Sequence, residues 1–92
     1  MIVRIAGEGQ YELPEDVAAQ LNELDNQAVA AVEAGDEARF QELFGQMLQI
    51  VTDGGAAVGD EELVASQVII PPRDLTFDEA KAEFTGDGLI PD

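Results

Sequence analysis

The chain has no cysteine and no histidine among its 92 residues. These absences exclude disulfide frameworks, thiolate zinc sites, cysteine nucleophiles and every acid–base mechanism that uses an imidazole. Basic residues are scarce as well: 4 Lys+Arg stand against 20 Asp+Glu, which gives a formal net charge of −16 and a pI near 4.1. Because phosphate backbones and anionic headgroups repel such a chain, we expect neither nucleic acid binding nor direct membrane insertion.

Long apolar runs are also missing. No stretch approaches the roughly 20 apolar residues that span a bilayer. The N-terminal segment lacks the basic region and long apolar region of a signal peptide. We therefore expect a cytoplasmic protein.

The acidic residues are spread evenly, with ten in residues 1–46 and ten in residues 47–92. A hydrophobic content of 46% separates the chain from disordered acidic tails, so we expect one folded domain over residues 1–92. Repulsion between like charges is largely screened at about 1 M salt, where the Debye length is about 3 Å. The composition therefore indicates a protein of a cytosol that holds molar salt, and an ordinary acidic protein of a dilute cytosol is the alternative.

Three short segments predict strands. Residues 2–6 are β-branched and mostly apolar, and a glycine-rich turn separates them from residues 10–13, so a β-hairpin is expected. Residues 67–70 predict a third strand, which Pro71 and Pro72 end.

Two long helices are expected between these strands, over about 14–34 and 37–53. Gly35 is suited to end the first helix, and Asp36 is suited to cap the second. Apolar residues recur in both helices at alternating spacings of four and three, which is typical of two helices packed along a shared seam. The seam residues are Val17, Leu21, Leu24, Ala28 and Ala31 in the first helix and Phe40, Phe44, Met47 and Val51 in the second. The small residues that follow, up to Gly59, predict a flexible loop.

A short C-terminal helix completes the predicted fold. Residues 76–79 fit a capping box, with Thr76 at the cap and Glu79 reaching back, so a helix is expected over about 77–85. The predicted class is α+β: an N-terminal β-hairpin plus a short third strand, packed against an α-helical hairpin and a short C-terminal helix.

The second predicted helix has a wider apolar face than the first helix can cover. The β-hairpin sheet is the favoured cover, because a thin core needs every apolar side chain, and a partner protein is the alternative. Two other apolar segments, at Pro71-Pro72 and at the C-terminus, offer further contacts, although the C-terminal segment is expected to fold back onto the core. The candidate partner-binding residues are Phe40, Leu43, Leu48, Ile50, Pro71, Pro72, Leu89, Ile90 and Pro91.

Motifs for catalysis or cofactor binding are weak. Ser66 and Lys81 are the one hydroxyl–amine pair to consider, and their spacing does not support a dyad. The segment from Asp53 to Glu62 fails as a calcium loop, because Val58 stands where the loop needs glycine. The Gly7-Glu8-Gly9 turn lacks the third glycine of a dinucleotide fingerprint. We expect no enzyme activity, no metal site and no cofactor.

The order of sequence features along the chain resembles one known family. These features are Met1-Ile2-Val3-Arg4-Ile5, Gly7-Glu8-Gly9-Gln10-Tyr11, Ala34-Gly35-Asp36, Asp60-Glu61-Glu62-Leu63-Val64, Val68-Ile69-Ile70-Pro71-Pro72, Thr76-Phe77-Asp78-Glu79 and Gly88-Leu89-Ile90-Pro91. Together they resemble the PspA-associated protein family (PspAA), over essentially the whole chain, as a haloarchaeal-type acidic member.

The resemblance implies an accessory protein of the phage shock, or envelope-stress, system without catalytic residues. Its partner would be a homologue of phage shock protein A, a coiled-coil membrane-remodelling protein related to the ESCRT-III group. That partner would recruit the chain to the inner face of the cell membrane. A homo-oligomer is a further alternative for its assembly. The alternative function is that of an acidic mimic or regulator that binds a basic surface of a nucleic-acid-binding protein.

Overall fold

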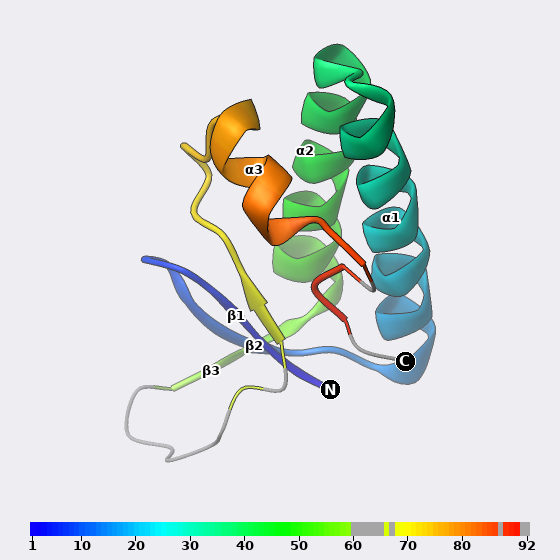
Figure 1. Cartoon of the computed structure of the whole chain (residues 1–92). Coiled ribbons are helices and arrows are strands. Elements are labelled where there is room, and N and C mark those ends of the chain that lie inside the picture. The colour runs from blue at the N-terminus through cyan, green and yellow to red at the C-terminus, as the bar shows by residue number, and fades with distance from the viewer. Residues whose placement is uncertain (60–65, 67, 87, 91–92) are drawn as a thin grey trace.

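The structure, a computed structural model, describes residues 1–59, 66, 68–86 and 88–90. In chain order the elements are β1 (Ile2–Ile5), β2 (Gly9–Glu12), α1 (Glu15–Ala34), α2 (Glu37–Gly54), β3 (Ala56–Val58), β4 (Val68–Ile70) and α3 (Phe77–Glu83). The two long helices stand side by side against the sheet, and α3 packs beside them beyond the end of β4 (Figure 1). The expected α+β class is confirmed.

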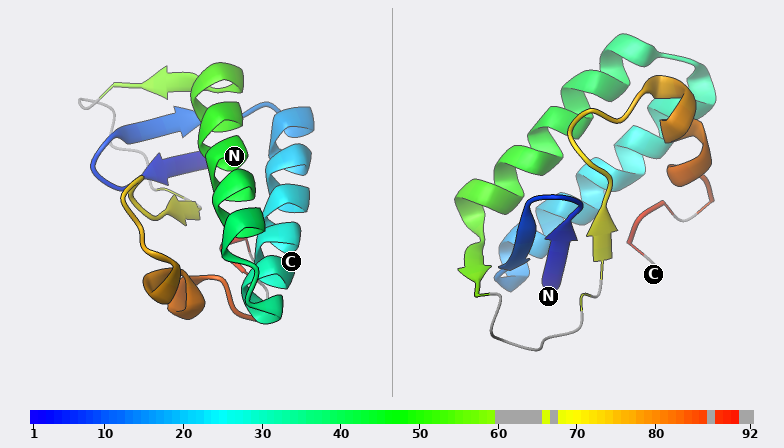
Figure 2. Two further views of the ribbon diagram at one scale, coloured as in Figure 1. Left: turned by 90° about the horizontal axis from the view of Figure 1, so that it is seen from above. Right: turned by 90° about the vertical axis from the view of Figure 1, so that its left-hand side faces the viewer.

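The sheet has the strand order β3-β2-β1-β4. Strands β1 and β2 form the expected antiparallel hairpin, whereas β4 pairs with β1 in parallel. Val3 lies opposite both Tyr11 and Val68, so these side chains share the face that packs against the helices. That face includes the buried residues Val3, Ile5, Val68 and Ile70, and Figure 2 shows both helices on the same side of the strands.

The segment after α2 was expected to be a flexible loop up to Gly59, and this prediction was wrong. Ala56–Val58 form strand β3, which pairs with β2 in antiparallel register. The chain enters this strand directly from the helix, because Gly55 is extended and sits against Leu13. A Cβ atom on Gly55 would lie 2.6 Å from both Leu13 Cδ2 and the backbone carbonyl oxygen of Val51, and because the carbonyl cannot move aside as a side-chain end can, the position requires glycine.

Local sequence chemistry sets the ends of the long helices. Gly35 adopts the left-handed conformation, with φ of 72°, and its N–H bonds to the carbonyl of Val32 at 3.0 Å. The side chain of Asp36 accepts a hydrogen bond from the backbone N–H of Arg39 at 3.1 Å and caps α2. Both predicted roles are confirmed. Helix α1 begins at Glu15, one residue later than expected, after Pro14.

The capping box is confirmed at the start of α3, and this helix ends at Glu83 rather than at 85. Phe77 of α3, and Phe84 directly after it, pack on α2. The ring centroid of Phe84 lies 5.0 Å from that of Phe40 and 6.1 Å from that of Phe44, and the Phe77 ring lies 5.9 Å from Phe40. Most of the wide apolar face of α2 is thus covered within the chain, by α3 as well as by the favoured sheet, whereas Ile50 is half-buried.

Candidate functional site

Most of the candidate partner-binding residues lie inside the molecule. The hydrophobic core includes four of them: Phe40, Leu43, Leu48 and Ile90. Pro71 is also buried, whereas Pro72 is exposed and Ile50 and Leu89 are half-buried. Pro91 lies outside the described residues. In this structure a partner can therefore reach Ile50, Pro72 and Leu89, while the four core side chains are occupied by contacts within the chain.

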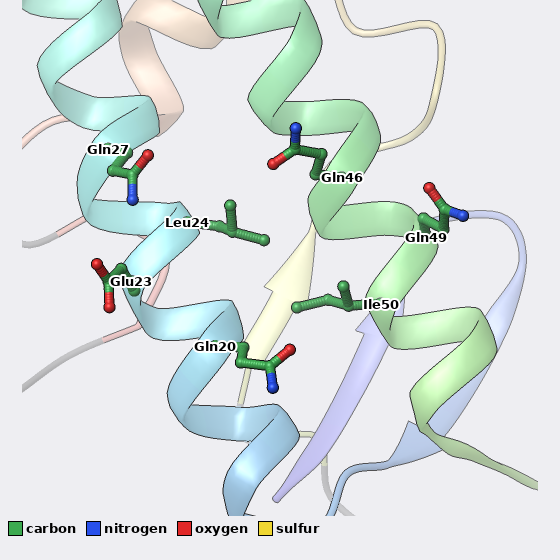
Figure 3. Close-up of a pocket in the computed structure, with 7 residues that line it drawn as sticks. All are labelled: Gln20, Glu23, Leu24, Gln27, Gln46, Gln49 and Ile50. Atoms are coloured by element: carbon green, nitrogen blue, oxygen red, sulfur yellow. The ribbon is translucent and has the colours of Figure 1, made fainter.

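Ile50 lines an open groove between α1 and α2, on the face of the helical hairpin turned away from the sheet (Figure 3). The groove has a volume of about 450 Å³. Leu24 and Ile50 point toward each other from the two helices and form its apolar floor. The residues that line it are Gln20, Glu23, Leu24, Gln27, Gln46, Gln49 and Ile50.

A second hollow of about 280 Å³ continues this groove toward the start of α1. It shares three lining residues with the first hollow, Gln20, Gln49 and Ile50, and adds Val17, Asp53 and Gly54. Val17 and Gln27 are ten residue steps apart on α1 and so lie about 15 Å apart along its axis, since an α-helix rises about 1.5 Å per residue. We call the two hollows together the α1–α2 groove. It is about three helical turns long.

The rim of the α1–α2 groove is mainly uncharged. It includes four of the seven glutamines in the chain, Gln20, Gln27, Gln46 and Gln49, whereas its charged lining residues are Glu23 and Asp53. Figure 3 shows the Glu23 carboxylate on the side of α1 that faces away from α2. Taking an amide out of water costs much less free energy than taking out a carboxylate. A partner can therefore cover this groove without desolvating a row of acids.

A hydrogen bond joins the two helices at the end of the groove nearest the turn between α1 and α2. The Arg39 guanidinium on α2 donates from Nη2 to Oε1 of Gln27 on α1, at 3.2 Å. The same guanidinium lies 3.5 Å from the Glu42 carboxylate. Arg39 thus holds one rim amide in place, and Glu42 offsets the positive charge that Arg39 brings to this end.

The buried stripe of α1 is rotated from the predicted seam of Val17, Leu21, Leu24, Ala28 and Ala31. Leu21, Ala28 and Ala31 are buried, but Val17 and Leu24 are half-buried at the edge that lines the groove. The other buried positions of α1 are Asp25, Val29 and Val32. Part of the predicted packing seam is therefore surface that a partner can reach.

Sequence reasoning missed Asp25, which is fully buried. Its carboxylate accepts the backbone N–H of Leu89 on both oxygens at 3.0 Å, and the N–H of Ile90 on Oδ2 at 3.0 Å. Asp25 comes four residues after Leu21 and three before Ala28, and this spacing places it on the apolar face of the helix. An acidic residue on that face could have indicated a buried carboxylate. It anchors the C-terminal segment to the middle of α1.

Comparison with known proteins places the chain in a family. The PspA-associated protein family (PspAA) matches residues 1–92. The chain belongs to this family. No curated protein and no solved structure matches it. The resemblance to the PspAA family is confirmed, whereas the haloarchaeal origin stays a prediction. The family name implies an association of this PspAA member with PspA.

Other groups that were considered for chemistry in this PspAA member have structural partners. The Ser66 hydroxyl accepts a hydrogen bond from Gln10 Nε2 at 2.6 Å. The Lys81 ammonium lies 3.5 Å from Asp78 and 5.3 Å from the centroid of the Phe77 ring. Within the described residues, no three carboxylates gather where they could hold a metal ion. The same part of the chain holds no helix long and apolar enough to cross a membrane.

Proposed function

We propose that this PspAA member is a non-enzymatic accessory protein of the phage shock system that binds a phage shock protein A homologue and modulates its assembly. The observation that carries the proposal is the family match over residues 1–92. Binding would place the chain, itself cytoplasmic and without affinity for nucleic acid, at the inner face of the cell membrane through its partner.

Apolar contact is the force that suits this association. A chain with a net charge of −16 gains little from charge steering once molar salt has shortened the Debye length to about 3 Å. Burial of apolar surface is not screened in this way. The half-buried apolar side chains of the described surface, such as Leu24 and Ile50, are therefore better contacts than its carboxylates.

Size-exclusion chromatography with light scattering tests the binding. The purified chain and the PspA homologue are mixed in multimolar KCl, with polyglutamate of similar length as a control for acidity. We expect the chain to co-elute with PspA and polyglutamate to elute alone. Separate elution of the chain at concentrations of about 100 μM would contradict the proposed association.

Sedimentation of PspA assemblies tests the modulation. Pelleting PspA with and without the chain should change the fraction that sediments, because a ligand that prefers one assembly state shifts the equilibrium toward it. Binding without any change in the pelleted fraction would leave the chain a passive PspA ligand and would contradict a modulating role.

The acidic mimic is the second candidate function, and charge is the observation that favours it. The described residues hold three ion pairs, Arg39–Glu42, Arg73–Glu8 and Lys81–Asp78, against 20 acidic residues in the chain. A large negative surface is thus available to a basic protein. The affinity of a charge mimic should fall steeply as salt rises, which separates it from apolar docking.

A further inference from the structure

We infer that the α1–α2 groove is the docking site of one amphipathic α-helix from the partner, about three turns long, with an apolar seam and without net negative charge. The inference rests on the proposed association with PspA and specifies the surface that performs it. Three features of the groove support it: its length, the position of its apolar side chains and the scarcity of charge on its rim.

The apolar side chains match the repeat of a helix. Val17 and Leu24 are seven residues apart on α1, so they lie on one face about 10 Å apart, and Ile50 faces Leu24 from α2. A helix laid between α1 and α2 would present residues at i, i+3 or i+4, and i+7 to these three positions. The groove length of about 15 Å accommodates about ten helical residues.

The rim sets the chemistry of the docked helix. Glutamine side chains can donate and accept hydrogen bonds to polar residues at the edges of the helix, and they carry no charge that must be desolvated. The charged lining residues, Glu23 and Asp53, are both acidic, and the whole chain is strongly negative. An acidic helix would be repelled at low salt, so the edges of the partner helix should be neutral or basic.

A second copy of the chain is a poorer occupant of the groove. In dilute buffer, repulsion between two chains that each carry a net charge of −16 opposes dimerisation through this face. The apolar floor consists of three half-buried side chains, Val17, Leu24 and Ile50. That floor is small beside the roughly 800 Å² per partner of a stable interface between folded proteins, whereas a single helix can lie along the groove and touch both α1 and α2.

Three variants that add the same charge test the site. Leu24→Glu and Ile50→Glu place a carboxylate on the groove floor. Ile69→Glu is the matched control, because Ile69 is 60% exposed and its register partner Arg4 lies on the sheet face turned away from the helices. Calorimetric titration into the PspA homologue in multimolar KCl should show at least tenfold weaker binding for both groove variants and less than twofold change for Ile69→Glu.

A second pair of variants covers the case in which a groove-floor change unfolds the chain. Gln20→Glu and Gln46→Glu charge the rim without touching the core, since both residues are exposed. Circular dichroism should show wild-type helix content. Affinity should fall several-fold in multimolar KCl, because docking would take the added carboxylates out of water while salt screens any attraction to basic residues. Hydrogen exchange on PspA should then show one protected helical segment of about ten residues with an apolar seam.

The outcomes separate the two proposals. If the wild-type chain fails to bind PspA, the proposed function is wrong, and a PspA helix does not dock in the groove. If the wild type binds and all folded groove variants bind equally well, or if Ile69→Glu alone abolishes binding, the function stands and the groove inference is overturned. If the wild type dimerises in sedimentation experiments and Leu24→Glu is monomeric, the occupant is a second copy, which also overturns the inference.

Discussion

The buried carboxylate of Asp25 on α1 accepts the backbone N–H of Ile90 at 3.0 Å, across 65 residues of sequence. Hydrogen bonds from Leu89 to both oxygens of the same carboxylate accompany it. Ile90 is therefore part of the folded core rather than a surface for a partner, whereas Leu89 beside it is half-buried.

Asp25→Asn should destabilise the chain by about 1–3 kcal/mol, because the amide replaces one acceptor oxygen with a donor that faces backbone N–H groups. Asp16→Asn is the matched control, since Asp16 is exposed in the first turn of the same helix and should cost less than about 1 kcal/mol. Urea denaturation measures both, and amide exchange at Leu89 and Ile90 should speed up in Asp25→Asn. Equal stability of the two variants would show that the C-terminal segment does not depend on Asp25.

Gly88→Ala should destabilise the chain more than Gly86→Ala. Both glycines have positive φ, 78° and 59°, so an alanine at either position costs about 1–2 kcal/mol of backbone strain. A Cβ atom on Gly88 would also lie 2.6 Å from Oδ2 of Asp25, whereas a Cβ atom on Gly86 meets nothing within 4 Å. Thermal unfolding of the two variants compares them, and equal melting temperatures would argue against the close contact of Gly88 with Asp25.

Local features of the fold were predictable from sequence because they depend on residues within four positions of one another. The left-handed Gly35, the Asp36 cap and the Thr76–Glu79 capping box all lie where the pattern predicts. Each is a hydrogen bond or a backbone conformation that neighbouring residues determine.

Features that depend on distant residues could not be predicted in the same way. Strand β3 consists of small residues without alternation, and its conformation comes from pairing with β2. The contacts of Phe84 with Phe40 and Phe44 join segments about 40 residues apart, so the pattern on α2 alone could not show that α3 covers it.

The candidate site was predicted less well than the fold for the same reason. An apolar residue on a helix has the same pattern whether the core or a partner covers it. Phe40 and Leu43 proved to be core residues, whereas Leu24, which was assigned to helix packing, lines the α1–α2 groove beside Ile50. The glutamines of the rim were visible in the sequence, but only the packing of α1 on α2 brings them together.

The capping box should weaken in acid. The backbone N–H of Thr76, and then its hydroxyl, hydrogen-bond to Glu79 and lower the pKa of that carboxyl. Because the pKa of Glu79 is lower in the folded state, its ionised carboxylate stabilises the fold. This stabilisation is complete at pH values above the ordinary glutamate pKa of about 4.3, and it is lost as the pH falls through the folded-state pKa. Carbon-detected NMR titration should give Glu79 a midpoint below the ordinary value, and Thr76→Val should move it part of the way back. An ordinary midpoint in the wild type would contradict the capping geometry.

Stability should rise with salt. Screening of the −16 charge in multimolar KCl should raise the melting temperature by at least about 4–8 °C, which corresponds to about 1 kcal/mol in a domain of this size. Glu33→Lys should raise it in dilute buffer and flatten the salt dependence, because α1 has no basic residue in its last turn. A melting temperature that does not change between dilute buffer and multimolar KCl would argue against adaptation to high salt.

The dependence of PspA binding on salt tests the proposed mode of association most directly. Titration calorimetry of the wild-type chain with the PspA homologue, from about 0.1 M to multimolar KCl, compares apolar docking with charge mimicry at constant protein concentrations. Docking of a helix in the α1–α2 groove predicts an affinity that holds or strengthens as salt rises. An affinity that falls steeply over the same range would show that the acidic surface, and not the groove, makes the contact.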